Sequence, residues 1–143
     1  MNARGFTFIE IVVVMVLVAV SGSLVYMSVG RSAEQKQGKI FAQEMMSLVK
    51  KARRTSVANS RPVAFLISSQ DRMCWVEGSS GDLEIPERVM IQEQGIAQLD
   101  GGVFGIYFYP DGSSSGGEIT LAADGVPFFV FQVDILTGLV TRG

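Results

Sequence analysis

The fold is decided by the stretch Arg4-Gly5-Phe6-Thr7-Phe8-Ile9-Glu10, which leads directly into an uncharged segment running from Ile11 to Gly30. Twenty residues at about 1.5 Å of rise each would form a helix of roughly 30 Å, the thickness of a bilayer core. Burying an ionised group in hydrocarbon costs at least a few kcal/mol, about 2.5 or more by insertion scales. The carboxylate of Glu10, at the start of this predicted span, therefore indicates a functional site that needs a cationic partner.

The same stretch, followed by its apolar run, resembles the class III signal of type IV pilins and type II secretion pseudopilins. The resemblance implies that a prepilin peptidase cleaves after Gly5 on the cytoplasmic side and removes the leader, residues 1–5. It also implies that the new amino terminus, at Phe6, is methylated. Glu10 would then occupy the fifth position of the mature chain, where the family carries a glutamate used in assembly.

Two other interpretations of the N-terminus stay open. An ordinary secretory signal peptide would be cleaved near the small residues Ser21 and Ser23. That interpretation leaves Phe6 and Phe8 where basic residues belong, and it places an acidic residue at the start of the apolar run. A plain single-pass anchor explains the length of the run but not the presence of Glu10.

Composition excludes most catalytic chemistry. The chain has 143 residues, no histidine and one cysteine, Cys74, which rules out histidine-dependent triads, a thiolate zinc site and an internal disulfide. No GxxxxGK[ST] or GxGxxG motif occurs. Together with the resemblance of the N-terminal motif, these absences favour an assembly subunit with no catalytic residues, no cofactor and no metal. A membrane-anchored binding module or enzyme acting alone is the alternative, and cleavage after Gly5 would distinguish the two.

Charge is distributed unevenly along the chain. Residues 31–61 contain eight basic and two acidic residues, whereas residues 62–143 contain three basic and eleven acidic residues. This asymmetry favours electrostatic contacts between neighbouring copies or partners. A basic cluster lies at Lys50, Lys51, Arg53 and Arg54. We interpret it as a solvated helix face, with approach to phospholipid or nucleic acid as the alternative.

The helical pattern continues beyond the predicted span, residues 6–30. Phe41, Met45, Leu48 and Ala52 recur at helical spacing, which predicts that residues 31–59 form an amphipathic helix with one apolar face. The apolar residues Ile40, Met46 and Val49 widen this face, and the glycines Gly22, Gly30 and Gly38 are points where the helix could bend. The turn-forming sequence Asn59-Ser60-Arg61-Pro62 predicts its end.

An antiparallel β domain is expected over residues 60–143. Runs rich in branched and aromatic residues predict seven strands, at Val63–Ser68, Met73–Glu77, Val89–Glu93, Val103–Tyr109, Glu118–Ala122, Phe128–Ile135 and Leu139–Arg142. Alternation predicts as buried Val63, Phe65, Ile67, Ile106, Phe108, Phe129, Phe131, Val133 and Ile135. The predicted fold class is α+β and pilin-like, with a long N-terminal helix packed against an antiparallel sheet that folds into two small layers.

Three segments of the β domain resemble the GspH/FimT family of minor pilins and pseudopilins. They are Phe108-Tyr109-Pro110-Asp111-Gly112-Ser113-Ser114, Glu118-Ile119-Thr120-Leu121 and Val133-Asp134-Ile135-Leu136-Thr137-Gly138. We interpret the glycine-rich run from Asp111 to Gly117 as a hairpin loop.

Two glycine-rich segments of the β domain are candidate contacts with partner subunits, because they could adapt to a partner. Asp111, Gly112, Gly116 and Gly117 form one such loop, and the connection from Gly95 to Gly102 is another, with solvent-facing hairpins as the equal alternative. A calcium site built from Asp100, Asp111 or Asp124 is an alternative that the sequence disfavours, because no ligand spacing resembles an EF-hand loop.

The function expected from these resemblances is that of a minor, tip-proximal subunit of a type II secretion pseudopilus, which promotes filament assembly and protein export across the outer membrane. The alternative is a minor type IV pilin for pilus assembly, adhesion, motility or DNA uptake. Expected partners are other pilin or pseudopilin subunits, the prepilin peptidase and the inner-membrane assembly platform. The expected location is the inner membrane, single pass, with the β domain periplasmic. Nucleic-acid binding is disfavoured, because the C-terminal segment offers one arginine, Arg142, on an acidic domain.

Overall fold

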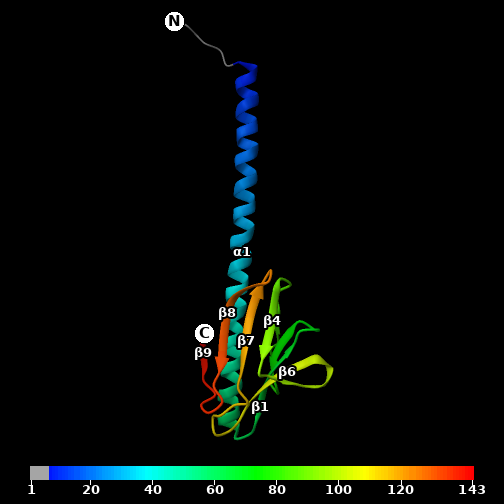
Figure 1. Cartoon of the computed structure of the whole chain (residues 1–143), viewed down its shortest axis with the longest axis vertical. Helices are drawn as coiled ribbons and strands as arrows, with labels where there is room; N and C mark the ends of the chain where they lie inside the picture. The colour runs from blue at the N-terminus through cyan, green and yellow to red at the C-terminus, as the bar shows by residue number, and fades with distance from the viewer. Residues whose placement is uncertain (1–6) are drawn as a thin grey trace. The chain divides into compact units, whose positions relative to one another are not determined.

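The computed structural model describes residues 7–143, and for residues 22–35 it describes the helical backbone alone. The chain divides into two compact units, residues 1–36 and residues 37–143. We call the second unit the head. One helix, α1 (Phe8–Asn59), supplies the whole described part of the first unit except Thr7, and it also supplies the first element of the head (Figure 1).

In the first unit, α1 begins where the sequence changes from small and polar residues to apolar ones. The backbone amides of Glu10 and Ile11 donate to the carbonyl of Thr7, at 3.0 and 3.4 Å. Among the described residues, no helix is both long enough and apolar enough to span a membrane. The predicted leader and the predicted cleavage and methylation residues Gly5 and Phe6 lie outside the described residues, as do the side chains in the last part of the predicted span.

In the head, α1 ends at Asn59, where the turn sequence before Pro62 predicts its end. Ser60 adopts a positive φ of 50°, which breaks the helical path. The Ser56 hydroxyl lies 2.8 and 2.9 Å from the carbonyl oxygens of Arg61 and Phe108, and its single proton is shared between these two acceptors. Ser56 therefore links the end of α1 to the first sheet, and its buried hydroxyl has hydrogen-bond partners.

Nine strands and a short 3₁₀ helix follow α1: β1 (Val63–Ser68), β2 (Met73–Val76), β3 (Leu83–Glu84), β4 (Val89–Gln94), β5 (Ala97–Gln98), η1 (Asp100–Gly102), β6 (Val103–Phe108), β7 (Gly117–Ala123), β8 (Val126–Val133) and β9 (Val140–Arg142). They form two antiparallel sheets, of order β3-β2-β1-β6-β5 and β4-β7-β8-β9. The seven predicted strands are confirmed with shifts of at most two residues, and the two-residue strands β3 and β5 were not predicted. The predicted division into two layers is also confirmed.

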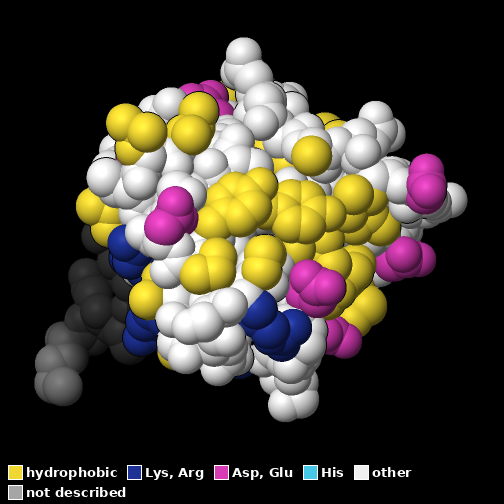
Figure 2. Space-filling view, turned by 90° about the horizontal axis from the view of Figure 1, so that it is seen from below, with side chains coloured by type: hydrophobic (Ala, Val, Ile, Leu, Met, Phe, Trp, Pro, Cys, Tyr) yellow, Lys and Arg dark blue, Asp and Glu magenta, His cyan; other side chains and the backbone are white. Residues whose placement is uncertain are grey.

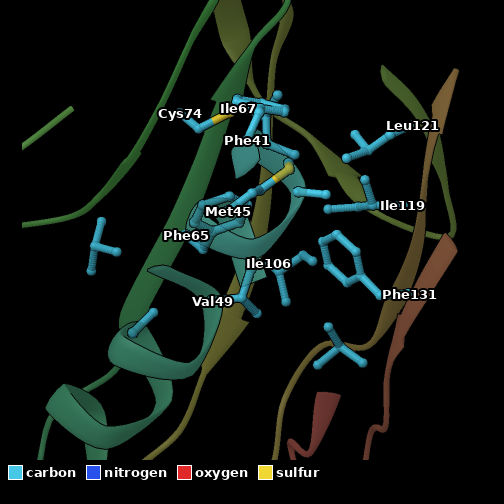
Figure 3. Packing of buried hydrophobic residues seen from close by; sticks show 14 of the residues in the cluster. Phe41, Met45, Val49, Phe65, Ile67, Cys74, Ile106, Ile119, Leu121 and Phe131 are labelled. Carbon is cyan, nitrogen blue, oxygen red and sulfur yellow. The ribbon is translucent and has the colours of Figure 1, made fainter. Parts of the chain in front are cut away.

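The core lies where α1 meets the inward faces of both sheets (Figure 3). The register aligns Phe65 of β1 with Val76 on one side and Ile106 on the other, so these three side chains share one face. The largest fully buried side chains come from all three layers: Met45 and Val49 from α1, Phe65, Ile67, Ile106 and Phe108 from the first sheet, and Ile119, Leu121, Phe131 and Val133 from the second. The apolar face of α1 is therefore covered by both sheets, as predicted.

Four apolar residues are less buried than the sequence pattern predicts. Ile135 is 61% exposed, because β8 ends at Val133 and the alternation does not continue past it. Phe129 and Leu48 are only partly buried, and Val49 takes the fully buried position on α1. Ile40, which seemed to widen the apolar face, is 54% exposed.

The hairpin predicted at Asp111–Gly117 is also corrected. The segment starts as a hairpin, since Phe108 and Ser114 form an antiparallel bridge. However, β7 pairs with β4 and β8 rather than with β6, so the segment crosses from one sheet to the other. Gly116 and Gly117 have φ values of 71° and 137°, which redirect the chain between the sheets.

Candidate assembly sites

The first candidate site is Glu10, in the first turn of α1. Its side chain is exposed in the isolated chain. A carboxylate in the first turn lies near the positive end of the helix dipole. Its pairing with the amine that cleavage would create at Phe6, in its own chain or a neighbour's, stays a prediction.

A second candidate site is the crossover between β6 and β7. The amide of Gly112 donates to the carbonyl of Tyr109 at 2.9 Å, and the amide of Tyr109 donates to the carbonyl of Ser113 at 3.0 Å. One carboxylate oxygen of Asp111 accepts from the hydroxyl and amide of Ser113, at 2.6 and 3.0 Å. These two hydrogen bonds lower the pKa of Asp111, since they stabilise its charged form.

The connection between β8 and β9 is also stabilised by hydrogen bonds to an aspartate side chain. One oxygen of Asp134 accepts from the amides of Thr137 and Leu136, at 2.8 and 3.1 Å, and from the Thr137 hydroxyl at 2.8 Å. The hydrogen bonds from Thr137, followed by that from Leu136, lower the pKa of Asp134. The loop is therefore held in one conformation by its own first residue.

Arg53 of α1 joins these two loops. Its Nε donates to the carbonyl of Thr137 at 2.9 Å and lies 3.3 Å from the carbonyl of Gly112. A Cβ at Gly138 would lie 2.4 Å from the carbonyl oxygen of Gly112, so this close approach requires glycine. Ser114 adds two more bonds, because its hydroxyl and amide donate to the carbonyls of Asp134 and Ile135, at 2.9 and 2.8 Å.

The four residues proposed as a contact loop occupy different environments. Asp111 is exposed, Gly117 is partly buried, and Gly112 and Gly116 are buried. A Cβ at Gly116 would lie 2.5 Å from Cγ1 of Ile135, so this glycine serves the packing of the two loops. A partner-binding role for the loop stays a prediction.

The neighbouring loop carries exposed apolar side chains that the sequence analysis missed. Leu136 is 82% exposed, Ile135 61% and Leu139 53%. The signal that was available is the sequence Asp134-Ile135-Leu136-Thr137-Gly138, in which an aspartate and a glycine bound two large apolar residues in a turn.

The basic cluster on α1 is divided between internal and external roles. Lys51 donates to the hydroxyl of Ser79 at 2.6 Å, and Arg53 holds the loops described above. Lys50 and Arg54 are exposed. Only this second pair forms part of a solvated helix face.

In the described part of the chain, no group of three or more acidic or cysteine side chains is arranged to hold a metal ion. Asp111, one of the three aspartates considered for calcium, instead accepts hydrogen bonds from Ser113.

Two family models match the chain. Residues 42–136, more than half of the chain, match the family described as "Type II transport protein GspH". The chain belongs to the GspH family. Residues 1–26 of this GspH-family chain also match the "Prokaryotic N-terminal methylation motif". The match confirms the predicted family, whose members are minor pilin-type or pseudopilin-type subunits. The methylation motif indicates a membrane-anchored subunit of an envelope filament that assembles with other pilin-type subunits and is a substrate of the prepilin peptidase.

The fold is also found in solved structures. The chain is similar to the type IV minor pilin FimU of Pseudomonas aeruginosa (strain PAO1) in space group P21, with a TM-score of 0.58 and 13% identity over 77% of this chain and 90% of FimU. A second structure of FimU, in space group P65, gives a TM-score of 0.51 and 15% identity over 73% and 91% of the two chains. At this identity the likeness shows the pilin-like α+β fold alone. No protein with curated annotation matches the chain. Pilin and pseudopilin families consist of structural subunits rather than enzymes.

Proposed function

We propose that this chain is a minor, tip-proximal subunit of a type II secretion pseudopilus that promotes filament assembly and protein export across the outer membrane. The observation that supports this most is the match of residues 42–136 to the type II transport protein family. The head also lacks the cysteine pair that closes a loop in many major pilins, since Cys74 is its single cysteine and is buried.

A minor type IV pilin that serves pilus assembly, adhesion, motility or DNA uptake is the second candidate. The observation that favours it is the likeness of fold to the minor pilin FimU. Both candidates use the same architecture, with an N-terminal helix for assembly and a β head for recognition.

The proposed anchoring follows from the N-terminal motif. Cleavage after Gly5 would create an amine at Phe6, and residues 6–30 would cross the inner membrane once, with the β domain in the periplasm and with contacts to the assembly platform. The uncharged segment after Glu10 has the length of a bilayer core, and the methylation motif covers residues 1–26. Intact mass of the membrane-extracted chain tests the processing: a mature chain starting at Phe6 supports it, and one starting near Ser21 contradicts it. Gly5 replaced by a bulky residue should keep the leader.

Deleting the gene and restoring it on a plasmid tests the two functions. Loss of protein export into the medium, with motility and DNA uptake intact, supports the pseudopilus. Loss of motility or DNA uptake, with export intact, supports the pilus. Loss of none of them contradicts both proposals.

Quantifying the chain in sheared filaments tests its rank. A few copies per filament, with fewer filaments when the gene is deleted, support a tip-proximal role. Copy numbers like those of the main subunit contradict it.

A further inference from the structure

The outer face of the five-stranded sheet is apolar. Along β1, Val63, Phe65 and Ile67 point into the core and are buried. The alternate positions, Ala64, Leu66 and Ser68, lie on the other face of the sheet. The first two are apolar, and Ala64 and Ser68 are already buried within the chain, whereas Leu66 is partly exposed. A strand with one solvent-exposed face normally alternates apolar and polar residues, whereas a continuous apolar run is typical of strands that are covered on both faces. On β1, the outer-face position that the chain itself leaves partly uncovered is therefore Leu66.

Four large side chains gather on this face. Leu66 is aligned with Trp75 of β2 on one side and with Gly105 of β6 on the other. Because Gly105 has no side chain, Leu66, Leu99 and Tyr107 converge over it. They lie at 3.1, 3.4 and 3.5 Å from the position that a Cβ would take. We call Leu66, Trp75, Leu99 and Tyr107 the outer patch.

The outer patch is separate from the core. Its four side chains are partly exposed, and none of them belongs to the buried cluster or to the side chains packed against it. A space-filling view from the end of the head at which α1 ends shows hydrophobic side chains gathered in a band, with both acidic and basic side chains beside it (Figure 2). Trp and Tyr are the residues most enriched among the energetic centres of protein interfaces.

Carboxylates lie along the margins of the outer patch. Glu84 of β3 is aligned with Met73 at one edge of the sheet, and Asp100 directly follows Leu99 at the other. Glu77 lies opposite Ala64, since its amide donates to the Ala64 carbonyl at 2.9 Å. All three carboxylates are exposed. The cations Lys51 and Arg61 lie beside Ser79 and Gly78, where β2 ends.

We propose that the outer patch binds a neighbouring pilin-type subunit that presents Lys or Arg side chains around an apolar centre. The inference rests on the proposed function of the chain as a filament subunit and adds the surface and the chemistry of its partner. Exposed carboxylates at both edges would repel an anionic lipid surface or a nucleic-acid backbone, since both are bound by cations. The same carboxylates attract a protein surface with a basic rim, and they steer its orientation.

Photo-cross-linking tests the outer patch in cells that contain the whole assembly system. A photoreactive amino acid replaces Leu99 in the full chain, and a matched control replaces Gln132, an exposed residue of β8 in the other sheet. We expect an adduct from position 99, but not from position 132, with a different subunit that has its own N-terminal methylation motif. Mass spectrometry of the adduct should locate the partner peptide beside Lys or Arg. Adducts with lipid, with nucleic acid or with a second copy of this chain, or equal yields at both positions, would overturn the proposal.

Two variants separate binding from folding. Trp75→Ala should lower the adduct yield from position 99 by roughly tenfold, the effect of removing an interface centre. Glu84→Lys reverses an exposed charge at the margin and should lower the yield while leaving the thermal midpoint unchanged, and Gln132→Lys is its control. Unchanged yield with Glu84→Lys and Trp75→Ala would overturn the proposal. Recovery of the wild-type chain in sheared filaments separates the two proposals. If the wild-type chain is present in filaments and both patch variants give the wild-type adduct yield, the outer patch is not the binding surface, but the proposed function stands. If the wild-type chain is absent from filaments, the proposed function itself fails.

Discussion

At the scale of single residues, the core of the head depends on a few ring and thioether side chains of α1. Phe41 is 3% exposed, while its neighbour Ile40 is 54% exposed. Phe41→Ala should lower the free energy of unfolding by about 3–5 kcal/mol, because it removes a buried ring and leaves a cavity. Ile40→Ala should change it by less than about 0.5 kcal/mol. Denaturant unfolding of the full chain in detergent measures both, and similar values for the two variants would contradict the described packing.

Cys74 illustrates how burial controls reactivity. Burial, followed by the nearby carboxylate of Glu93, raises the pKa of the Cys74 thiol to about 12. Only the thiolate reacts with alkylating reagents, so at about pH 8 roughly one thiol in ten thousand is reactive even before access is considered. We expect no alkylation of the folded chain and complete alkylation after unfolding, as followed by intact mass. Rapid alkylation under native conditions would show that β2 opens easily.

Glu93 couples the stability of the head to pH. Desolvation by burial raises its pKa, although hydrogen bonds from its own backbone and from Ser69 oppose the shift. The folded state therefore favours the neutral acid. Below the pKa of this glutamate in the unfolded chain, about 4.3, Glu93 does not lower the free energy of unfolding. As the pH rises through the raised pKa of the folded state, its burial lowers the free energy of unfolding increasingly.

Glu93→Gln should therefore stabilise the head at neutral pH, by less than about 1 kcal/mol because the group still contacts water. The gain should vanish below about pH 4. Glu84→Gln, at an exposed position of β3, is the control. Unfolding midpoints measured across this pH range check the prediction, and a gain that persists in acid would point to a cause other than ionisation.

At the scale of the elements, strong periodicity made α1 and the longer strands predictable from the sequence. β1 was predicted with its observed bounds, because branched residues fill it and turn residues flank it. β3 and β5 contain two residues each, which is too short for alternation to be visible. They depend on longer neighbours, since β3 pairs with β2 and β5 with β6.

The crossover between β6 and β7 shows a different limit of the sequence. Local turn chemistry predicted a hairpin, and its first part does run beside β6, because the amide of Ser115 donates to the carbonyl of Tyr107 at 2.8 Å. Which sheet receives the next strand depends on long-range pairing with β4 and β8. The outer patch was missed for a similar reason, because only the register brings Leu66, Trp75 and Tyr107 together.

Gly116 provides a test of this crossover. It has a φ of 71°, and a Cβ would lie 2.5 Å from Ile135. Gly125 has a φ of 79° and nothing within 4 Å of the Cβ position. Gly125→Ala should cost about 1–2 kcal/mol for the left-handed conformation alone, and Gly116→Ala should cost about 1–3 kcal/mol more for the overlap. Thermal and denaturant unfolding compare the two, and equal costs would contradict the tight packing of the crossover on Ile135.

At the scale of the whole molecule, the two candidate types of contact have different physical characters. The motif around Glu10 is shared by a superfamily and would act in a lipid environment, whereas the outer patch belongs to the head and would act in water. Their different surroundings also separate their roles: a charge in lipid penalises any arrangement that leaves it unpaired, and an aromatic patch contributes affinity. A subunit that carries both can be held in register by one and recognised by the other.

Glu10 gives the prediction that belongs to this scale. In the proposed mature chain, its carboxylate can pair with the Phe6 amine of its own helix, four residues away, or with that of a neighbour, which would fix the axial stagger between subunits. Removing one partner of a buried pair costs about 3–5 kcal/mol, whereas an intact pair mainly sets register. Glu10→Gln should therefore leave cleavage and membrane insertion intact and lower recovery in sheared filaments by tenfold or more, since even the lower end of that range corresponds to more than about a hundredfold in an equilibrium constant. Glu44→Gln removes an exposed carboxylate of α1 in the head and should have no such effect. Immunoblots of filaments and membranes measure both variants, and normal recovery of Glu10→Gln would show that this carboxylate does not set the register of the assembly.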